Sequence, residues 1–158
     1  MTGKIAAGVI VLTALVAGVV LYWTQVYAFY KDVAFTPGQE VMLTSITTGK
    51  PEPILTAGVT GIDADSSPIR FRACFTTPLS QAMLSETFVA YEGAEPLTAP
   101  KWFDCFNAYE IGTALEKGEA LAFLSEANVS QDVDRVVAVF PDGRAYAWTQ
   151  LNPAAKDK

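Results

Sequence analysis

The chain has 158 residues, which is enough for one small domain beside a short extra segment. With a mean hydropathy of +0.25 and only 18% charged residues, the chain is more apolar than a typical soluble protein. The sequence contains no histidine, which excludes Ser-His-Asp and Cys-His nucleophiles, imidazole ligands for zinc, haem or copper, and a histidine phosphorelay. We therefore expect no catalytic residue, no metal site and no cofactor, and expect that the protein is not an enzyme.

The apolar excess is concentrated near the N-terminus. No charged side chain occurs between Lys4 and Lys31, and residues 5–23 are almost entirely apolar. Nineteen helical residues cover roughly the 30 Å of a bilayer's hydrocarbon layer. We expect a cytoplasmic tail at 1–4 and a transmembrane anchor at 5–30, ending in aromatic residues suited to the membrane interface. These residues are Tyr22, Trp23, Tyr27, Phe29 and Tyr30.

A cleaved signal peptide is the main alternative to an anchor, but its apolar stretch is usually shorter and ends at small residues. Lys4 precedes the span and Lys31 beside Asp32 follows it, so the positive-inside rule places the N-terminus in the cytoplasm. The remainder from Asp32 has nine basic against seventeen acidic side chains, a net charge of −8. Such a domain should not bind nucleic acid.

Small side chains recur along one stripe of the expected span. Helices that carry such residues can approach one another closely in a membrane, so the stripe predicts an integral-membrane protein partner. The simpler interpretation is that Ala and Gly are common in any spanning helix. The stripe comprises Gly3, Ala7, Val11, Ala14 and Gly18.

After a tether at 31–40, residues 41–48 are rich in β-branched side chains and predict a strand that the turn-forming residues 49–53 end. Residues 54–62 are ambiguous, and 63–68 should form a loop. That loop begins with the Asp-x-Asp-x-Ser pattern of a calcium site, but Pro68 stands where such a site needs its glycine. We favour a turn. Residues 69–75 alternate and predict a half-buried strand.

A short helical turn is expected at 78–84 and a strand at 86–92. Asn107 is a suitable N-cap for a helix at 108–117, with Glu110 completing a capping box. Residues 120–125 could be a strand or a buried helical turn.

Two strands, 135–140 and 144–151, flank a Pro-Asp-Gly turn and predict a C-terminal hairpin, followed by a frayed tail at 152–158. These elements indicate an α+β fold with a mainly antiparallel sheet at 41–151.

Cys74 and Cys105 lie beyond the span, among aromatic residues. In an oxidising compartment, two cysteines in a small domain most simply form one structural disulfide. A redox-active or metal-binding pair is the alternative, although the cysteines lack the close spacing typical of such sites. The aromatic residues near Cys105 and on the last strand are expected in the core: Trp102, Phe103, Phe106, Tyr146 and Trp148.

Four segments carry a resemblance that covers essentially the whole chain: QVYAFY at 25–30, DADSSPIRFRACFTTP at 63–78, WFDCF at 102–106 and DGRAYAWTQLNP at 142–153. They resemble a family of small single-span, membrane-anchored proteins of unknown function from alphaproteobacteria related to Rhodobacter and Paracoccus. The resemblance implies a bacterial inner membrane with a periplasmic domain, and transfers no catalytic residues.

The sequence favours a non-catalytic accessory or assembly subunit of a respiratory or photosynthetic inner-membrane complex. The alternative is a periplasmic thiol-redox or metal-handling protein that uses Cys74 and Cys105. A ligand-binding sensor has less support, because only residues 1–4 are expected in the cytoplasm.

Overall fold

The computed structural model describes residues 2–156 and divides the chain into two units, one ending at Tyr30 and one beginning at Lys31. The first unit consists of the helix α1 (Thr2–Trp23) and the π-helical turn η1 (Thr24–Ala28). No residue of α1 is buried. Together the two form a helix that is long and apolar enough to cross a membrane.

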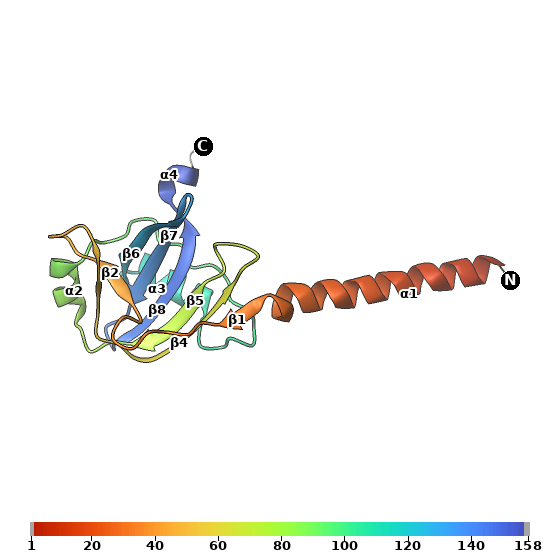
Figure 1. The fold of residues 1–158 in the computed structure, drawn as a ribbon, viewed down its shortest axis with the longest axis horizontal. Helices are drawn as coiled ribbons and strands as arrows, with labels where there is room; N and C mark the ends of the chain where they lie inside the picture. The colour runs from red at the N-terminus through yellow and green to blue at the C-terminus, as the bar shows by residue number, and fades with distance from the viewer. Residues whose placement is uncertain (1, 157–158) are drawn as a thin grey trace. The chain divides into compact units, whose positions relative to one another are not determined.

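The second unit is built around a six-stranded sheet (Figure 1), and the pairs among its last five strands are antiparallel. This confirms the expected α+β class and the C-terminal hairpin. In spatial order the strands are β1 (Tyr30–Asp32), β4 (Ala57–Ala64), β5 (Arg72–Thr76), β8 (Arg144–Leu151), β7 (Val133–Val139) and β6 (Leu121–Ser130).

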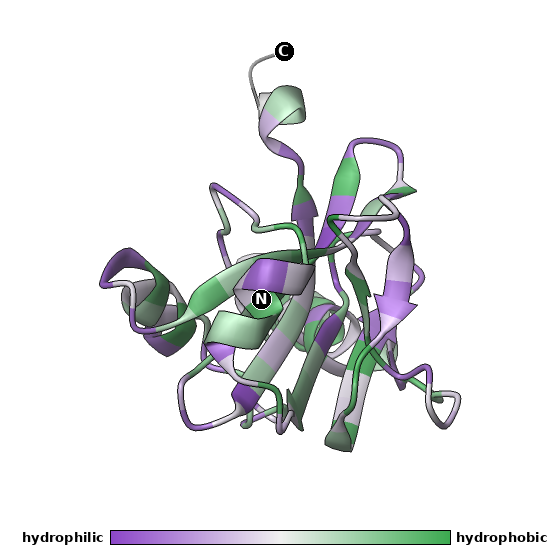
Figure 2. Ribbon diagram, turned by 90° about the vertical axis from the view of Figure 1, so that its left-hand side faces the viewer, coloured by the Kyte–Doolittle hydropathy of each residue, from purple (hydrophilic) through white to green (hydrophobic). Residues whose placement is uncertain are grey.

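One face of the sheet, called here the first face, packs against the hairpin of β2 (Met42–Thr44) and β3 (Pro51–Pro53) and against α2 (Gln81–Thr87). Leu43 and Leu84 from these elements are fully buried in this core. Val33 and Phe35, from the segment expected as a tether, pack against the same core. Figure 2 shows that hydrophobic and hydrophilic residues both occur along the strands.

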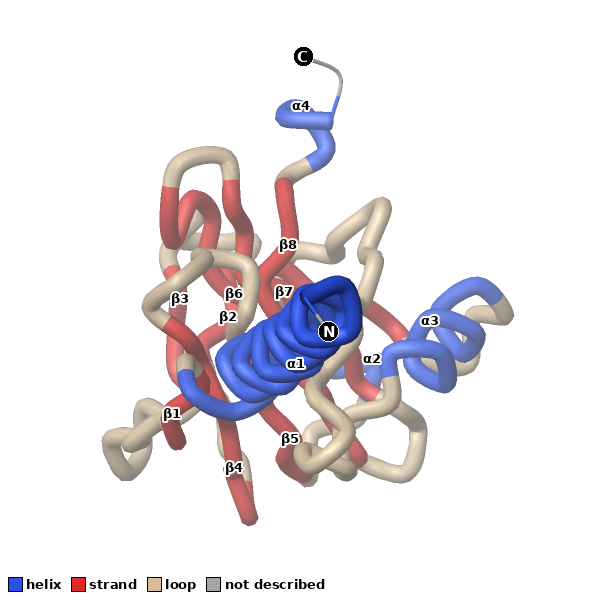
Figure 3. Tube along the Cα trace, turned by 90° about the vertical axis from the view of Figure 1, so that its right-hand side faces the viewer, coloured by secondary structure: helices blue, strands red, loops and turns tan. Residues whose placement is uncertain are grey.

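The opposite, second face of the sheet packs against α3 (Ala108–Glu116). Ile111 and Ala114 of the helix meet Val136 and Trp148 of the strands in a separate buried cluster. Figure 3 shows α3 on one side of the strands and β2 and β3 on the other. The sheet is therefore covered on both sides.

This double cover corrects the expected half-buried strand at 69–75. Its alternation is real, because Phe71 and Ala73 belong to the first-face core whereas Cys74 belongs to the second. However, Arg72 is only 3% exposed and Cys74 only 8%, because the polypeptide after residue 90 covers the face expected in solvent.

Several predicted boundaries were also wrong. The expected strand at 41–48 shortens to β2, and part of its expected stop forms β3. The strand expected at 86–92 does not form, because α2 continues to Thr87 and only isolated bridges at Phe88 and Ala90 follow.

The expected helix, in contrast, is confirmed. The Asn107 side chain accepts from the backbone N–H groups of Tyr109 and Glu110 at 3.2 Å each, and Gly118 follows the C-cap with a positive φ of 71°. The Glu110 carboxylate accepts from Arg144 instead of completing a capping box. The tail begins with a short helix, α4 (Pro153–Lys156), and residues 157–158 lie outside the described part.

Candidate functional site

The small residues of the expected helix-packing face all lie on α1 and are all exposed. A Cβ atom added at Gly3 or Gly18 would meet nothing within 4 Å. The stripe of Gly3, Ala7, Val11, Ala14 and Gly18 is therefore uncovered along its length.

Among the expected interface aromatics, Tyr22 and Trp23 end α1 and Tyr27 lies in η1. Phe29 follows η1, and Tyr30 begins β1. Trp23 stacks on Tyr27 with ring centroids 5.2 Å apart, and Tyr22 meets the edge of Tyr27 at 6.2 Å. Phe29 is 46% exposed. Amphipathic rings grouped in this way are typical of the membrane interface.

In the second unit, Cys74 and Cys105 form a disulfide. Cys74 lies on β5, buried on the second face, whereas Cys105 is exposed in the connection that leads into α3. That connection, residues 92–106, contains no helix or strand, and we refer to it as the strap. The disulfide fastens the end of the strap to the middle of the sheet.

Arg72 fastens the middle of the strap. Its guanidinium is buried beside the Phe106 ring, 5.8 Å from the ring centroid. Nε donates to the carbonyl of Leu97 at 2.8 Å, and Nη2 donates to that of Thr98 at 3.2 Å. Charge-assisted bonds of this kind are among the stronger hydrogen bonds in proteins, so Arg72 serves to hold backbone in place.

Gln150 fastens the beginning of the strap from β8 and is 2% exposed. Its side-chain oxygen accepts from the backbone N–H of Glu95 at 2.7 Å and from the Trp148 indole at 2.9 Å. Its side-chain nitrogen donates to the carbonyl of Gly93 at 3.1 Å. The disulfide, Arg72 and Gln150 are called here the three fasteners of the strap. Together they hold an irregular segment that would otherwise be mobile.

A groove of about 790 Å³ runs between α3, the strap and the start of β6. Ala94, Pro96 and Leu115 contribute apolar surface, and the charged residues that line it, Glu95 and Glu116, are both acidic. Tyr109 at its edge is 83% exposed.

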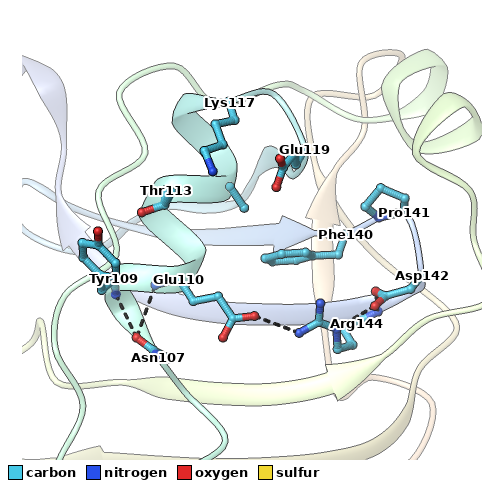
Figure 4. Close-up of a pocket in the computed structure, with 11 residues that line it drawn as sticks. Asn107, Tyr109, Glu110, Thr113, Lys117, Glu119, Phe140, Pro141, Asp142 and Arg144 are labelled. Atoms are coloured by element: carbon cyan, nitrogen blue, oxygen red, sulfur yellow. Dashed lines mark hydrogen bonds and ion pairs between the residues drawn. The ribbon is translucent and has the colours of Figure 1, made fainter.

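A second groove, of about 720 Å³, lies between α3 and the β7–β8 turn. Figure 4 shows Arg144 between Glu110 and Asp142, to which it donates at 3.1 and 2.7 Å. The hydrogen bonds from Arg144 lower the pKa of Asp142, and those that Arg144 makes to Asp142 and Glu110 raise its own pKa. One guanidinium therefore compensates part of the charge of two carboxylates.

Neither groove holds a recognisable catalytic constellation, and within residues 2–156 no group of three or more Cys, Asp or Glu side chains is placed to hold a metal ion. Asp63 and Asp65, which begin the calcium-like pattern, lie in different surroundings. Asp63 lies at the end of β4, whereas Asp65 forms an ion pair with Lys31.

The sequence predicted the disulfide, but it did not reveal the strap or the roles of Arg72 and Gln150 in holding it. Arg72 gave one usable signal, because it shares a strand face with Cys74, and a charged residue beside a core cysteine needs partners.

The prediction of core aromatics is confirmed for Trp148 and Phe106, which are buried. Phe103 and Tyr146 are partly buried against the second-face core, and Trp102 is 39% exposed.

No curated protein and no solved structure matches the chain. Residues 41–158, which exclude α1 but include the strap, both cysteines and the hairpin, match DUF6446, a family of unknown function. Since the match covers most of the chain, the protein belongs to the DUF6446 family, in agreement with the resemblance to a family without an established activity.

Proposed function

We propose that this protein is a non-catalytic, membrane-anchored accessory or assembly subunit of a bacterial inner-membrane complex, respiratory or photosynthetic. In this proposal α1 remains uncleaved with its N-terminus in the cytoplasm, and the domain lies in the periplasm. An integral-membrane partner contacts the small-residue stripe of α1.

The strap is the observation that carries the proposal. Two of the buried polar side chains, Arg72 and Gln150, hold backbone carbonyls and an N–H group of the strap. A disulfide and fixed hydrogen bonds pre-organise this surface, and pre-organisation reduces the entropic cost of binding a partner.

The proposal is tested by purifying the tagged chain in mild detergent from cells grown under respiratory and photosynthetic conditions, with quantitative mass spectrometry. A stoichiometric membrane complex is expected, and its recovery should fall for Gly18→Leu but not for the off-stripe control Val19→Leu. Recovery of the monomer alone under every condition would refute the proposal.

The second candidate function is a periplasmic thiol-redox or metal-handling protein. It is favoured by one observation: Cys105 lies in an exposed part of the strap while Cys74 is buried, so an external thiolate would attack the pair from the Cys105 side. Thiol titration of protein isolated without reductant distinguishes the candidates. A fully formed disulfide that resists mild reduction would support the accessory role, and ready reduction would support redox exchange.

A further inference from the structure

The first face of the sheet contains a partly enclosed cavity of about 270 Å³. Its floor includes Phe71 of β5 and Ala147 of β8, and residues 33–36 and 39–42 contribute to its lining from above the sheet. Asp63 at the end of β4 and Arg135 of β7 contribute charged groups. All these residues belong to the second unit.

Asp63 and Arg135 do not form an ion pair with each other. One oxygen of Asp63 accepts from the N–H of the adjacent Ala64 at 2.8 Å. Arg135 donates from Nη1 to Glu126 at 2.8 Å, and its guanidinium lies 4.4 Å from the centre of the Phe71 ring. The side chain of Arg135 is therefore held over the cavity floor.

The side chains of Arg135 and Asp63 are each incompletely hydrogen-bonded or solvated. The Nε atom of Arg135 is buried and has no hydrogen-bond acceptor among the described residues. Burial raises the pKa of the half-buried Asp63, and the Ala64 N–H and the nearby Arg135 offset that effect only in part, so its carboxylate is partly desolvated. A buried donor without an acceptor and a desolvated carboxylate are each destabilising. A bound molecule with an anionic group beside Arg135 and a cationic group beside Asp63 would reduce these costs.

We propose that this cavity binds a small zwitterion, namely a free α-amino acid with a short apolar side chain. Its carboxylate accepts from the guanidinium of Arg135, its ammonium donates to Asp63, and its side chain contacts Phe71. The proposal does not depend on the accessory-subunit function, because it concerns the opposite face of the sheet from the strap.

The charge of the lining favours a zwitterion over a simple ion. Glu40 and Glu126 also line the cavity, so a carboxylate without an ammonium group would face three acidic side chains and a single guanidinium. An amine without a carboxylate would offer no acceptor to the guanidinium of Arg135. The volume admits a molecule of a few heavy atoms and excludes a nucleotide or a folded peptide.

The test uses the full chain in detergent micelles, with saturation-transfer NMR and calorimetric titration. The probes are glycine, L-alanine, L-valine and L-leucine, together with isovalerate and isobutylamine, which each lack one charge of valine. At least one amino acid should bind, and the single-charge analogues should bind about tenfold more weakly or worse, since each loses a charge-assisted bond.

Asp63→Asn and the conservative Arg135→Lys should each weaken amino-acid binding about tenfold or more, while Glu116→Gln, on α3, should leave it unchanged. Near-UV circular dichroism would check that the variants remain folded. Three results would overturn the proposal: no binding of any of the four amino acids at concentrations on the order of 10 mM, equal binding of isovalerate or isobutylamine, or binding that neither Asp63→Asn nor Arg135→Lys weakens.

Discussion

Gly61 on β4 shows how one residue couples the segment after α1 to the sheet. A Cβ atom at this position would lie 2.7 Å from the ring of Phe35 and 3.2 Å from the carbonyl oxygen of Arg72. In the same region, the backbone N–H of Val33 donates to the Gly61 carbonyl at 2.9 Å. Only glycine allows the ring to lie so close to the strand.

Gly61→Ala should therefore destabilise the domain by about 1–3 kcal/mol, the usual cost of overpacking a core. Gly112→Ala is the matched control. Its added methyl group would meet Pro96 at an ordinary 3.6 Å within helix α3, so the higher helix propensity of Ala should stabilise by about 0.5–1 kcal/mol. Urea unfolding followed by circular dichroism measures both, and a Gly61→Ala variant as stable as the wild type would contradict the close packing.

Asp63 and Asp142 should give opposite pH dependence. Burial raises the folded-state pKa of Asp63, so stability is lost as the pH rises through that pKa, and Asp63→Asn should stabilise the domain at pH 7. Hydrogen bonds from Arg144 lower the pKa of Asp142. Its stabilising effect is present above the unfolded pKa and is lost as the pH falls, so Asp142→Asn should destabilise the domain at pH 7.

Both differences should shrink once the carboxyl groups are protonated, and thermal unfolding of each variant between pH 3 and pH 7 measures them. Two shifts of the same sign at pH 7 would contradict this account. A stabilising Asp63→Asn would also indicate that the wild-type carboxylate is retained for binding at the expense of stability.

At the scale of the elements, the disulfide and Arg72 both hold the strap in place. Removing the disulfide by Cys105→Ser should cost about 3–4 kcal/mol on the chain-entropy model. Arg72→Met leaves the carbonyls of Leu97 and Thr98 without their donor and should cost on the order of 3 kcal/mol. Because each change loosens the same residues, the double variant should lose less than the sum of the two.

Hydrogen exchange provides the second measurement for these variants. The N–H of Glu95, bonded to Gln150, should lose protection in either single variant, while the N–H of Val137 in the central strand β7 should keep it. Strictly additive losses of stability, with unchanged exchange at Glu95, would show that the strap is not a cooperative unit.

The same elements show what local sequence can predict. The α3 helix and the β7–β8 hairpin were predicted because their signals, the Asn107 cap and the Pro-Asp-Gly turn, are adjacent in sequence to the elements they specify. The strap was not predicted, because the residues that hold it are far from it in sequence: Glu95 and its partner Gln150 are 55 positions apart. Similarly, Thr44 and Ser125, which join β2 to β6 across 81 positions, carry no mutual signal in a single sequence.

The candidate cavity was beyond sequence reasoning for the same reason. Asp63 was noted only as part of a calcium-like loop, and Arg135 only as the start of a strand. Topology places β4 and β7 in one sheet, and the packing of residues 33–42 closes the space above it. The two cysteines could be paired from composition alone, because no other pairing within the chain exists.

At the scale of the whole molecule, the boundary between the two units at Tyr30 and Lys31 differs from the start of the family match at residue 41. The intervening residues include Lys31, which pairs with Asp65, and Val33 and Phe35, which pack against the first-face core. The folding unit should therefore begin near residue 31.

A chain of residues 31–158 should consequently fold without α1, remain monomeric in aqueous buffer and form the Cys74–Cys105 disulfide. A chain of residues 41–158 should be less stable by about 2–5 kcal/mol, because it lacks the Phe35 ring, the Val33 side chain and the N–H bond to Gly61. Phe35→Ala in the longer chain is the matched control and should reproduce most of that loss. Urea unfolding of the three proteins provides the comparison, and equal stability of the two truncated chains would mean that residues 31–40 serve only as a link to the membrane.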